Sequence, residues 1–136
     1  MTKRILIMGL PGSGKTTLAL ELMQLLAPNA VHLNADAIRK INNDWDFSEE
    51  GRIRQAKRMR TLADGIVRDY AIADFVAPLP EMRRIYHADY TIWVDTIKEG
   101  RFADTNQVFD PPTDYNMCVT TQNAEYWAKL ITNELR

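Results

Sequence analysis

The chain alternates between short apolar runs and longer stretches in which apolar residues recur every three or four positions. The apolar runs predict five strands, at residues 3–8, 31–34, 71–77, 90–94 and 116–120. The helical spacing predicts helices at residues 15–27, 35–42, 81–87 and 123–135, and a longer one from Ser48 to about Tyr70. Strands that alternate with helices build a parallel sheet covered on both faces. We therefore expect an α/β fold of three layers, with a five-stranded parallel sheet between helices.

Residues 95–114 lack this periodicity. The segment contains Gly100 and the pair Pro111-Pro112, and it precedes the last predicted strand. About twenty residues without regular structure are unusual inside a compact domain unless they form a functional lid or a disordered segment. We expect a lid here, within a single domain that comprises all 136 residues.

A phosphate-binding loop (P-loop) follows the first predicted strand. Residues 9–16 read GLPGSGKT, which matches the pattern G-x-x-x-x-G-K-[ST], and a predicted helix follows directly. In such a loop the backbone N–H groups surround an anion, and the positive end of the helix adds to the field. Strand, loop and helix together favour a site for the phosphates of ATP. The residues that we expect to bind the nucleotide here are Gly12, Ser13, Gly14, Lys15, Thr16 and Thr17.

Two side chains of this loop are expected to do more than bind. Lys15 supplies a positive charge for the β- and γ-phosphates, and we assign it to catalysis. The Thr16 hydroxyl is placed to ligate Mg²⁺, so ATP and Mg²⁺ are the expected cofactors. We also expect the Lys15 side chain to be exposed to solvent when the site is empty.

Composition and charge narrow the function classes. Hydrophobic residues make up 46% of the chain and the net charge is −1, so no overall field attracts nucleic acid or membranes. Cys118 is the only cysteine, which excludes an internal disulfide and a cysteine-built zinc site. His32 and His87 are too far apart for a metal motif. No apolar run approaches the ~20 residues that span a bilayer, and a strand begins at the N-terminus, so we expect a cytoplasmic protein without a signal peptide.

Two carboxylates belong to the predicted sheet or lie next to it, one just after a strand and one within a strand. Asp36 follows the second strand, and the carboxyl ends of parallel strands line the ligand crevice of such folds. It can hold Mg²⁺ or accept the proton of an attacking hydroxyl, or it can simply stabilise the first turn of its helix. Asp74 lies within the apolar third strand, where it is either a Mg²⁺ partner or a solvent-facing residue of an edge strand.

Basic residues are dense between residues 39 and 60, and most of them are expected to be solvated. Arg39 and Arg52 are the best candidates for substrate contact, because both follow elements that begin at the crevice. Arginine forks suit sulfate or phosphate oxygens. Phe47 can stack on a purine or act as a hydrophobic staple for the next helix.

Three runs of residues together resemble the adenylylsulfate kinases. The runs are GLPGSGKTTLA at 9–19, LNADAIR at 33–39 and FSEEGR at 47–52, and the resemblance is closest over residues 4–60. The family pattern of the second run is similar to L-D-G-D-N-x-R, and that of the third to F-S-x-x-D-R. The joint occurrence of all three runs is much more specific than the loop alone.

The resemblance implies a P-loop kinase that passes the γ-phosphate of ATP to the 3′-hydroxyl of adenosine 5′-phosphosulfate (APS). It implies that Asp36 is the catalytic carboxylate and that Arg39, Phe47 and Arg52 hold APS. In such kinases a lid lies before the last strand, so Arg101 is expected to contact the nucleotide.

The sequence departs from the family at several positions. Asn34 replaces a usual acidic residue, Gln55 replaces an Asn, and Ala77 replaces a serine. Leu79-Pro80 replaces an aromatic–arginine pair. The lid lacks a K-G-L-Y run, and residues 94–112 resemble those of short, phage-encoded kinases of this type.

We therefore expect a kinase for an anionic small molecule, with APS as the leading acceptor. Nucleosides, nucleotides and a modified base in DNA are alternative acceptors, and a nucleotide-binding module with little catalysis is an alternative of another class. We expect no membrane partner. Nucleic acid is a less favoured partner that the sequence does not exclude, and the sequence also allows a homodimer. The chain lacks the N-K-x-D signature for guanine, and its length argues against a GTPase switch or a motor.

Overall fold

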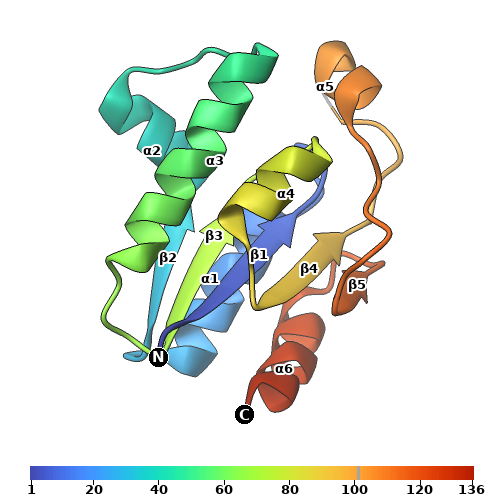
Figure 1. Cartoon of the computed structure of the whole chain (residues 1–136). Helices are drawn as coiled ribbons and strands as arrows, with labels where there is room; N and C mark the ends of the chain where they lie inside the picture. Colours follow the sequence, from blue (N-terminus) through green and yellow to red (C-terminus); the bar gives the residue numbers. More distant parts are fainter. Residues whose placement is uncertain (101) are drawn as a thin grey trace.

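A five-stranded parallel sheet forms the centre of the molecule, in the order β2-β3-β1-β4-β5 (Figure 1). This computed structural model describes residues 1–100 and 102–136, apart from the side chain of Asp104. The strands are β1 (Lys3–Met8), β2 (Ala30–Asn34), β3 (Tyr70–Asp74), β4 (Tyr90–Val94) and β5 (Met117–Val119). The predicted α/β fold with a five-stranded parallel sheet is confirmed.

The side chains of β1 alternate between two cores, as the period of a strand requires. Ile5 and Ile7 are buried against one layer of helices, and Leu6 and Met8 are buried against the other. Both faces of the strand are therefore apolar, which is typical of a central parallel strand. This explains why its sequence is a continuous apolar run.

The helices form a layer on each face of the sheet (Figure 1). Buried residues of α1 and α6 share one core, and those of α2, α3 and α4 share the other. The helices are α1 (Lys15–Leu26), α2 (Ala35–Asn42), α3 (Glu49–Asp64), α4 (Pro80–Tyr86), α5 (Ala103–Val108) and α6 (Ala124–Leu135). In the described part of the chain, no helix combines the length and the apolar character that crossing a membrane requires.

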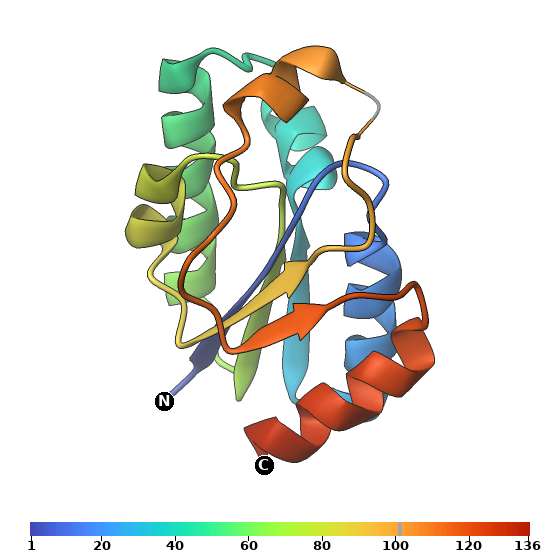
Figure 2. The ribbon, with the colours of Figure 1, turned by 90° about the vertical axis from the view of Figure 1, so that its right-hand side faces the viewer.

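Two elements differ from the prediction. Helix α3 ends at Asp64, about six residues early, where Gly65, a poor helix former, is the C-cap residue in a right-handed conformation. The apolar spacing in the sequence extended to Ile66, because this residue packs against the core from the turn that follows the helix. The expected lid is not wholly irregular, since it contains the short helix α5. Figures 1 and 2 both show α5 above the carboxyl ends of the strands, on the side where the P-loop lies.

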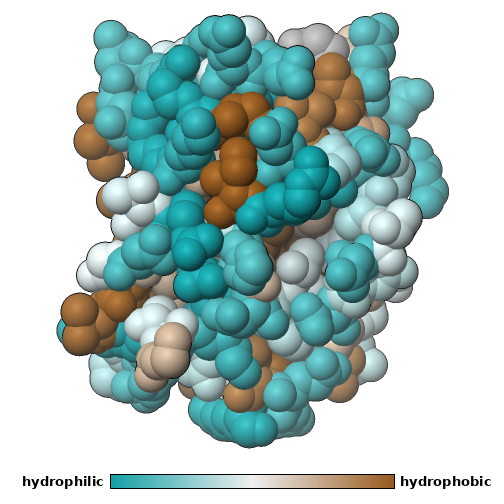
Figure 3. All heavy atoms as spheres, viewed as in Figure 1, coloured by the Kyte–Doolittle hydropathy of each residue, from teal (hydrophilic) through white to brown (hydrophobic). Residues whose placement is uncertain are grey.

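The outer surface of the α3–α4 layer is mainly hydrophilic, with several separate apolar patches rather than one continuous area (Figure 3). The charged residues of α3 supply much of this character, since Arg54 and Lys57 are exposed. The basic residues of this helix are thus divided between its faces, because Arg52 is buried.

Candidate functional site

The P-loop connects β1 to α1 at the carboxyl edge of the sheet. Gly9, Gly12 and Gly14 all have positive φ angles, of 153°, 86° and 105°. At Gly9 a Cβ atom would lie 2.5 Å from the carbonyl oxygen of Val94, so this close approach of two strands requires glycine. The loop therefore has the conformation that places its N–H groups around an anion at the start of α1.

Lys15 is buried, and the expectation of an exposed side chain is wrong. Its residue is 9% exposed, and its Nζ donates a hydrogen bond of 3.1 Å to the carbonyl oxygen of Leu10. The loop folds over the lysine, which also lines the pocket described below. The charge is thereby held at the anion site before any ligand arrives.

Two residues that the sequence reasoning missed hold the P-loop from outside. The hydroxyl of Thr96, just after β4, donates to the carbonyl oxygen of Ser13 at 2.6 Å. The amide of Gln122, after β5, donates to the carbonyls of Gly12 and Ser13 at 3.5 and 3.4 Å. Both follow the carboxyl ends of strands, so the rule that selected Asp36 would also have found them.

Thr16 and Asp74 meet directly. The Thr16 hydroxyl donates to Oδ2 of Asp74 at 2.8 Å, and the same oxygen accepts from Nδ2 of Asn34 at 3.1 Å. His32 Nε2 lies 3.2 Å from this oxygen. Asp74 is 3% exposed on a strand with neighbours on both sides, so the alternative of a solvent-facing edge residue is wrong.

Asp36 lies in the first turn of α2 and is exposed at the mouth of the site. It lines the same pocket as Thr16 and Asp74, but no hydrogen bond joins it to either of them among the described residues. Of the three predicted metal ligands, the structure thus brings two into contact and leaves Asp36 available to another group.

Arg39, Phe47 and Arg52 form one cluster. The guanidinium of Arg39 lies 4.4 Å from the centre of the Phe47 ring, and that of Arg52 lies 5.8 Å from it. Arg39 and Arg52 are 4% and 6% exposed, whereas Phe47 is 49% exposed. A staple would need an apolar partner at the fourth helical position, which is Arg52, so Phe47 is not a staple.

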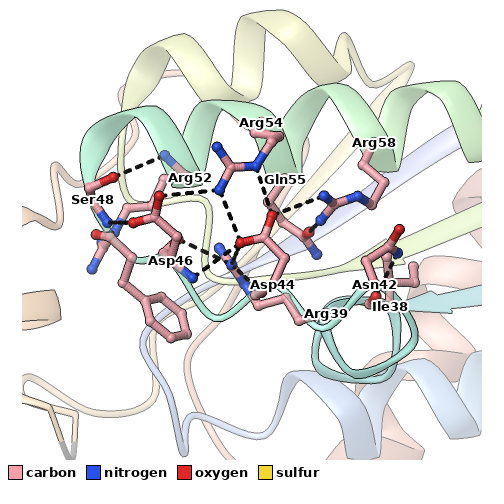
Figure 4. Close-up of polar contacts among 12 residues, drawn as sticks. Ile38, Arg39, Asn42, Asp44, Asp46, Ser48, Arg52, Arg54, Gln55 and Arg58 are labelled. Atoms are coloured by element: carbon pink, nitrogen blue, oxygen red, sulfur yellow. Dashed lines mark hydrogen bonds and ion pairs between the residues drawn. The ribbon is translucent and has the colours of Figure 1, made fainter.

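Asp44 determines which arginines are neutralised (Figure 4). Its carboxylate accepts two hydrogen bonds from Arg54 at 2.8 and 3.0 Å and one from Arg58 at 2.9 Å. These hydrogen bonds lower the pKa of Asp44 far below its usual value. Arg39 is 4.0 Å from the same carboxylate and donates instead to the backbone oxygens of Asp44 and Asp46.

The two buried arginines consequently keep much of their charge for a ligand. Arg52 donates through Nε to the carbonyl oxygen of Phe47 at 2.8 Å and has no carboxylate partner among the described residues. Burial lowers the pKa of Arg39, an effect that the Asp44 carboxylate opposes and that Arg58 and Arg52 reinforce. Such a pair of buried guanidiniums is stabilised by an anion.

Gly51 lets the loop of residues 44–47 lie against α3. A Cβ atom at this position would be 2.2 Å from the carbonyl oxygen of Asp46. The glycine occupies the third helical position, where a glutamate would complete a capping box with Ser48. Asp46 takes over that role, since its Oδ1 accepts from the backbone N–H of Ser48 at 2.9 Å.

We expect Gly51→Ala to displace this loop, and Phe47 with it. The overlap with Asp46 should destabilise the protein by about 1–3 kcal/mol, as overpacking does, and weaken acceptor binding. Chemical denaturation and acceptor titration measure the two effects. Gly65→Ala at the other end of α3 is the matched control, because its nearest contact would be an ordinary 3.6 Å. Equal effects of the two substitutions would contradict the prediction.

The segment that follows β3, residues 75–78, is hydrogen-bonded to the end of the lid. Ala77 has a φ of 48°, and its carbonyl oxygen accepts from Arg83 Nε at 2.9 Å. The same guanidinium donates to the carbonyl oxygens of Pro78 and Asp110. The backbone N–H of Asp110 in turn donates to Pro78 at 2.9 Å. Strand β3 itself ends at Asp74, three residues before its predicted end. Phe75 and Val76 still make backbone hydrogen bonds to Ile7 and Gly9 before the left-handed residue Ala77 turns the chain.

One pocket of about 560 Å³ is lined by residues of the P-loop, by Asp36 and Asp74, and by the cluster of Arg39, Phe47 and Arg52. Its volume is within the usual range of roughly 300–1,000 Å³ for small-molecule sites. Apolar side chains, among them Phe75 and Met82, also line the pocket. Ser13, which was predicted to bind the nucleotide, is buried and does not line this pocket, and Arg101 lies outside the described residues. The predicted residues that line the pocket are Gly12, Gly14, Lys15, Thr16, Thr17, Asp36, Arg39, Phe47, Arg52 and Asp74.

A family model for adenylylsulfate kinases matches residues 1–114. Among solved structures, an APS kinase of Mycobacterium tuberculosis in complex with AMPPNP and APS is similar with a TM-score of 0.83 and 19% identity, over 98% of this chain and 97% of that chain. A shikimate kinase from Acinetobacter baumannii in complex with shikimate has a TM-score of 0.68 and 16% identity, over 99% of this chain and 93% of that chain. No curated protein sequence matches the chain. At these identities the structural similarity shows the fold alone.

Proposed function

The chain belongs to the adenylylsulfate kinase family and is an ATP-dependent phosphotransferase, and we propose that its acceptor is APS. The observation that carries this proposal is the cluster of Arg39, Phe47 and Arg52, which lines the same pocket as the P-loop. The cluster offers two buried guanidiniums and one half-exposed aromatic ring, which suits a ligand that has both an anionic group and a flat base.

The charges of the cluster favour an anionic acceptor. Sulfate and phosphate oxygens accept hydrogen bonds from guanidinium forks, and these bonds are stronger when they are shielded from water. Asp44 binds Arg54 and Arg58 closely and leaves Arg52 without a carboxylate among the described residues. A neutral acceptor would leave Arg52 without a carboxylate partner among the described residues, and Arg39 with only the carboxylates of Asp44 and Asp36.

The donor side suits a metal-bound nucleotide. Thr16 and Asp74 supply a hydroxyl and a carboxylate, which are the hard oxygen ligands that Mg²⁺ prefers. Among the described residues no cluster of three or more His, Cys, Asp or Glu could form a complete metal cage. This fits an ion that is held by one or two protein oxygens together with phosphates. Mg²⁺ would supply charge neutralisation on the phosphates of ATP.

Asp36 is the proposed catalytic carboxylate. It is exposed and lines the same pocket as the P-loop and the arginine cluster, and its carboxylate makes no hydrogen bond among the described residues. It would orient the acceptor hydroxyl and take its proton, while Lys15 and the loop N–H groups stabilise the transferred phosphoryl group. The lid over the site would exclude water, the competing acceptor.

An ADP-release assay across a panel of acceptors tests the proposal. The panel contains APS, nucleosides, nucleotides and oligonucleotides, with a water-only control. We expect APS to give the highest kcat/KM. Calorimetry with APS in the presence of ADP and Mg²⁺ provides a second measurement, and no binding at millimolar APS would defeat the assignment. Turnover of a nucleoside or an oligonucleotide instead would identify the alternative acceptor.

We expect Arg52→Met to raise the KM for APS about ten-fold or more, because a charge-assisted hydrogen bond is worth roughly 1.5–3 kcal/mol. Methionine keeps most of the buried stem, so the change removes charge rather than volume. The affinity for ATP should be nearly unchanged, because the P-loop is a separate element. Arg60→Met removes the same charge from the same helix, where Arg60 pairs with Asp64, and serves as the control. A similar KM change in both variants would contradict a direct role of Arg52.

A further inference from the structure

Three side chains converge on one oxygen of Asp74. Thr16 donates to Oδ2 from α1, and Asn34 donates from β2. His32, also on β2, places Nε2 at 3.2 Å from it. We propose that His32 is a positioning residue, which holds the Asp74 carboxylate in the orientation that the metal ion accompanying ATP needs. The inference rests on the proposed donor chemistry but not on the identity of the acceptor.

The hydrogen bonds leave the two oxygens of Asp74 with different roles. A carboxylate oxygen has two lone pairs in its plane, so three donors fully occupy Oδ2. No described residue donates to Oδ1. Asp74 lines the pocket although it is only 3% exposed, so Oδ1 is the oxygen that can meet a metal ion or its bound water. The hydrogen bonds to Oδ2 thus hold the carboxylate so that Oδ1 faces the metal ion.

The strand register explains how His32 reaches this position. Asn34 is opposite Asp74 in the β2–β3 ladder, and His32 is opposite Ile72. His32 therefore approaches Asp74 diagonally, two residues along the strand and on the same face of the sheet. This is the face that α1 covers, since Ile72 is buried with residues of α1.

The other two donors to Asp74, Thr16 and Asn34, also take part in other interactions, so neither of them serves only to orient the carboxylate. The Thr16 hydroxyl is itself a candidate metal ligand. Asn34 uses its Oδ1 to cap α2, where it accepts from the N–H of Ala37 at 2.9 Å. The imidazole of His32 is 14% exposed and has its one described polar contact with Asp74. His32 is thus the donor whose contact serves the orientation of Asp74 alone.

The test compares His32→Leu with His32→Gln. Leucine fills similar space without a donor, whereas the glutamine amide can reach the position of Nε2. We expect His32→Leu to weaken Mn²⁺ binding to the enzyme–ADP complex about ten-fold or more, as loss of an outer partner of a metal ligand does. Mn²⁺ binding is measured by electron paramagnetic resonance, and ADP binding in EDTA should not change. His32→Gln should restore most of the Mn²⁺ affinity.

Several results would overturn the inference. Mn²⁺ affinity within two-fold of wild type in His32→Leu, or tighter binding, would show that the contact does not prepare the carboxylate. Equal losses in the leucine and glutamine variants would assign the effect to ring packing. If His32→Leu does not fold, as judged by thermal melting, His32→Asn replaces it, because its amide is too short to reach Oδ2. The assay contains no acceptor, so it is independent of the APS assignment.

Discussion

Replacing Lys15 with methionine should lower the rate of phosphoryl transfer a few hundred-fold and leave the fold intact. Preorganised charge at a developing anion contributes roughly 3–4 kcal/mol to transition-state stabilisation. The structure holds this charge inside the P-loop, with Nζ bonded to the carbonyl oxygen of Leu10. Because the lysine stem is buried, Lys15→Met keeps its volume, whereas Lys15→Ala would also leave a void.

Single-turnover kinetics with saturating ATP measures this loss, and thermal melting checks the fold. Lys129→Met is the control, since Lys129 is exposed on α6 and pairs only with Glu125 among the described residues. Its rate should equal that of the wild type. If Lys15→Met transferred phosphate at the wild-type rate, Lys15 would have no role in catalysis, and the proposed action of the P-loop would be wrong.

Asp36→Asn should lower kcat by about 10²–10⁴-fold, the usual contribution of a positioned general base. The amide keeps the size of the side chain but loses its negative charge and basicity. ATP affinity should change little, because Asp36 makes no hydrogen bond to the P-loop or to Asp74 among the described residues. The neighbouring Arg39 would lose one favourable charge, which is a smaller effect than the loss of the base.

Two measurements distinguish these effects: titration with ATP gives the affinity, and turnover at saturating substrate gives kcat. If ATP affinity collapsed while turnover stayed normal, Asp36 would be a binding residue only. Asp69→Asn makes the same change at an exposed position next to the amino end of β3, on the opposite edge of the sheet. That control should behave like the wild type in both measurements.

The parts of the site that the sequence predicted are those in which local pattern and chemistry agree. The P-loop needs glycines between a strand and a helix, so residues 9–16 identified both the conformation and the ligand class. Asp36 was found because parallel strands direct the residues that follow them to one edge. The same rule, applied to every strand, would have added Thr96 and Gln122.

The remaining features depend on contacts between segments that are distant in the chain. His32 gains its significance from the β2–β3 register, and Asp74 is 42 residues away from it. The burial of Lys15 follows from the path of the loop around it. The helix α5 contains only six residues, too few to produce a helical period in the sequence. The need for glycine at position 51 also could not be predicted, because it depends on Asp46 occupying the space that a side chain would fill.

The attachment of the lid affects the exchange of ligands. Its first part touches the P-loop, since a Cβ atom on Gly100 would lie 3.1 Å from Pro11. Its last part is held by Arg83 to the loop after β3, which forms a wall of the acceptor pocket. The two ends of the lid therefore lie against two different parts of the pocket. We expect opening of the lid to break contacts at one or both of these ends, so that exchange of ligands depends on Arg83 as well as on the P-loop.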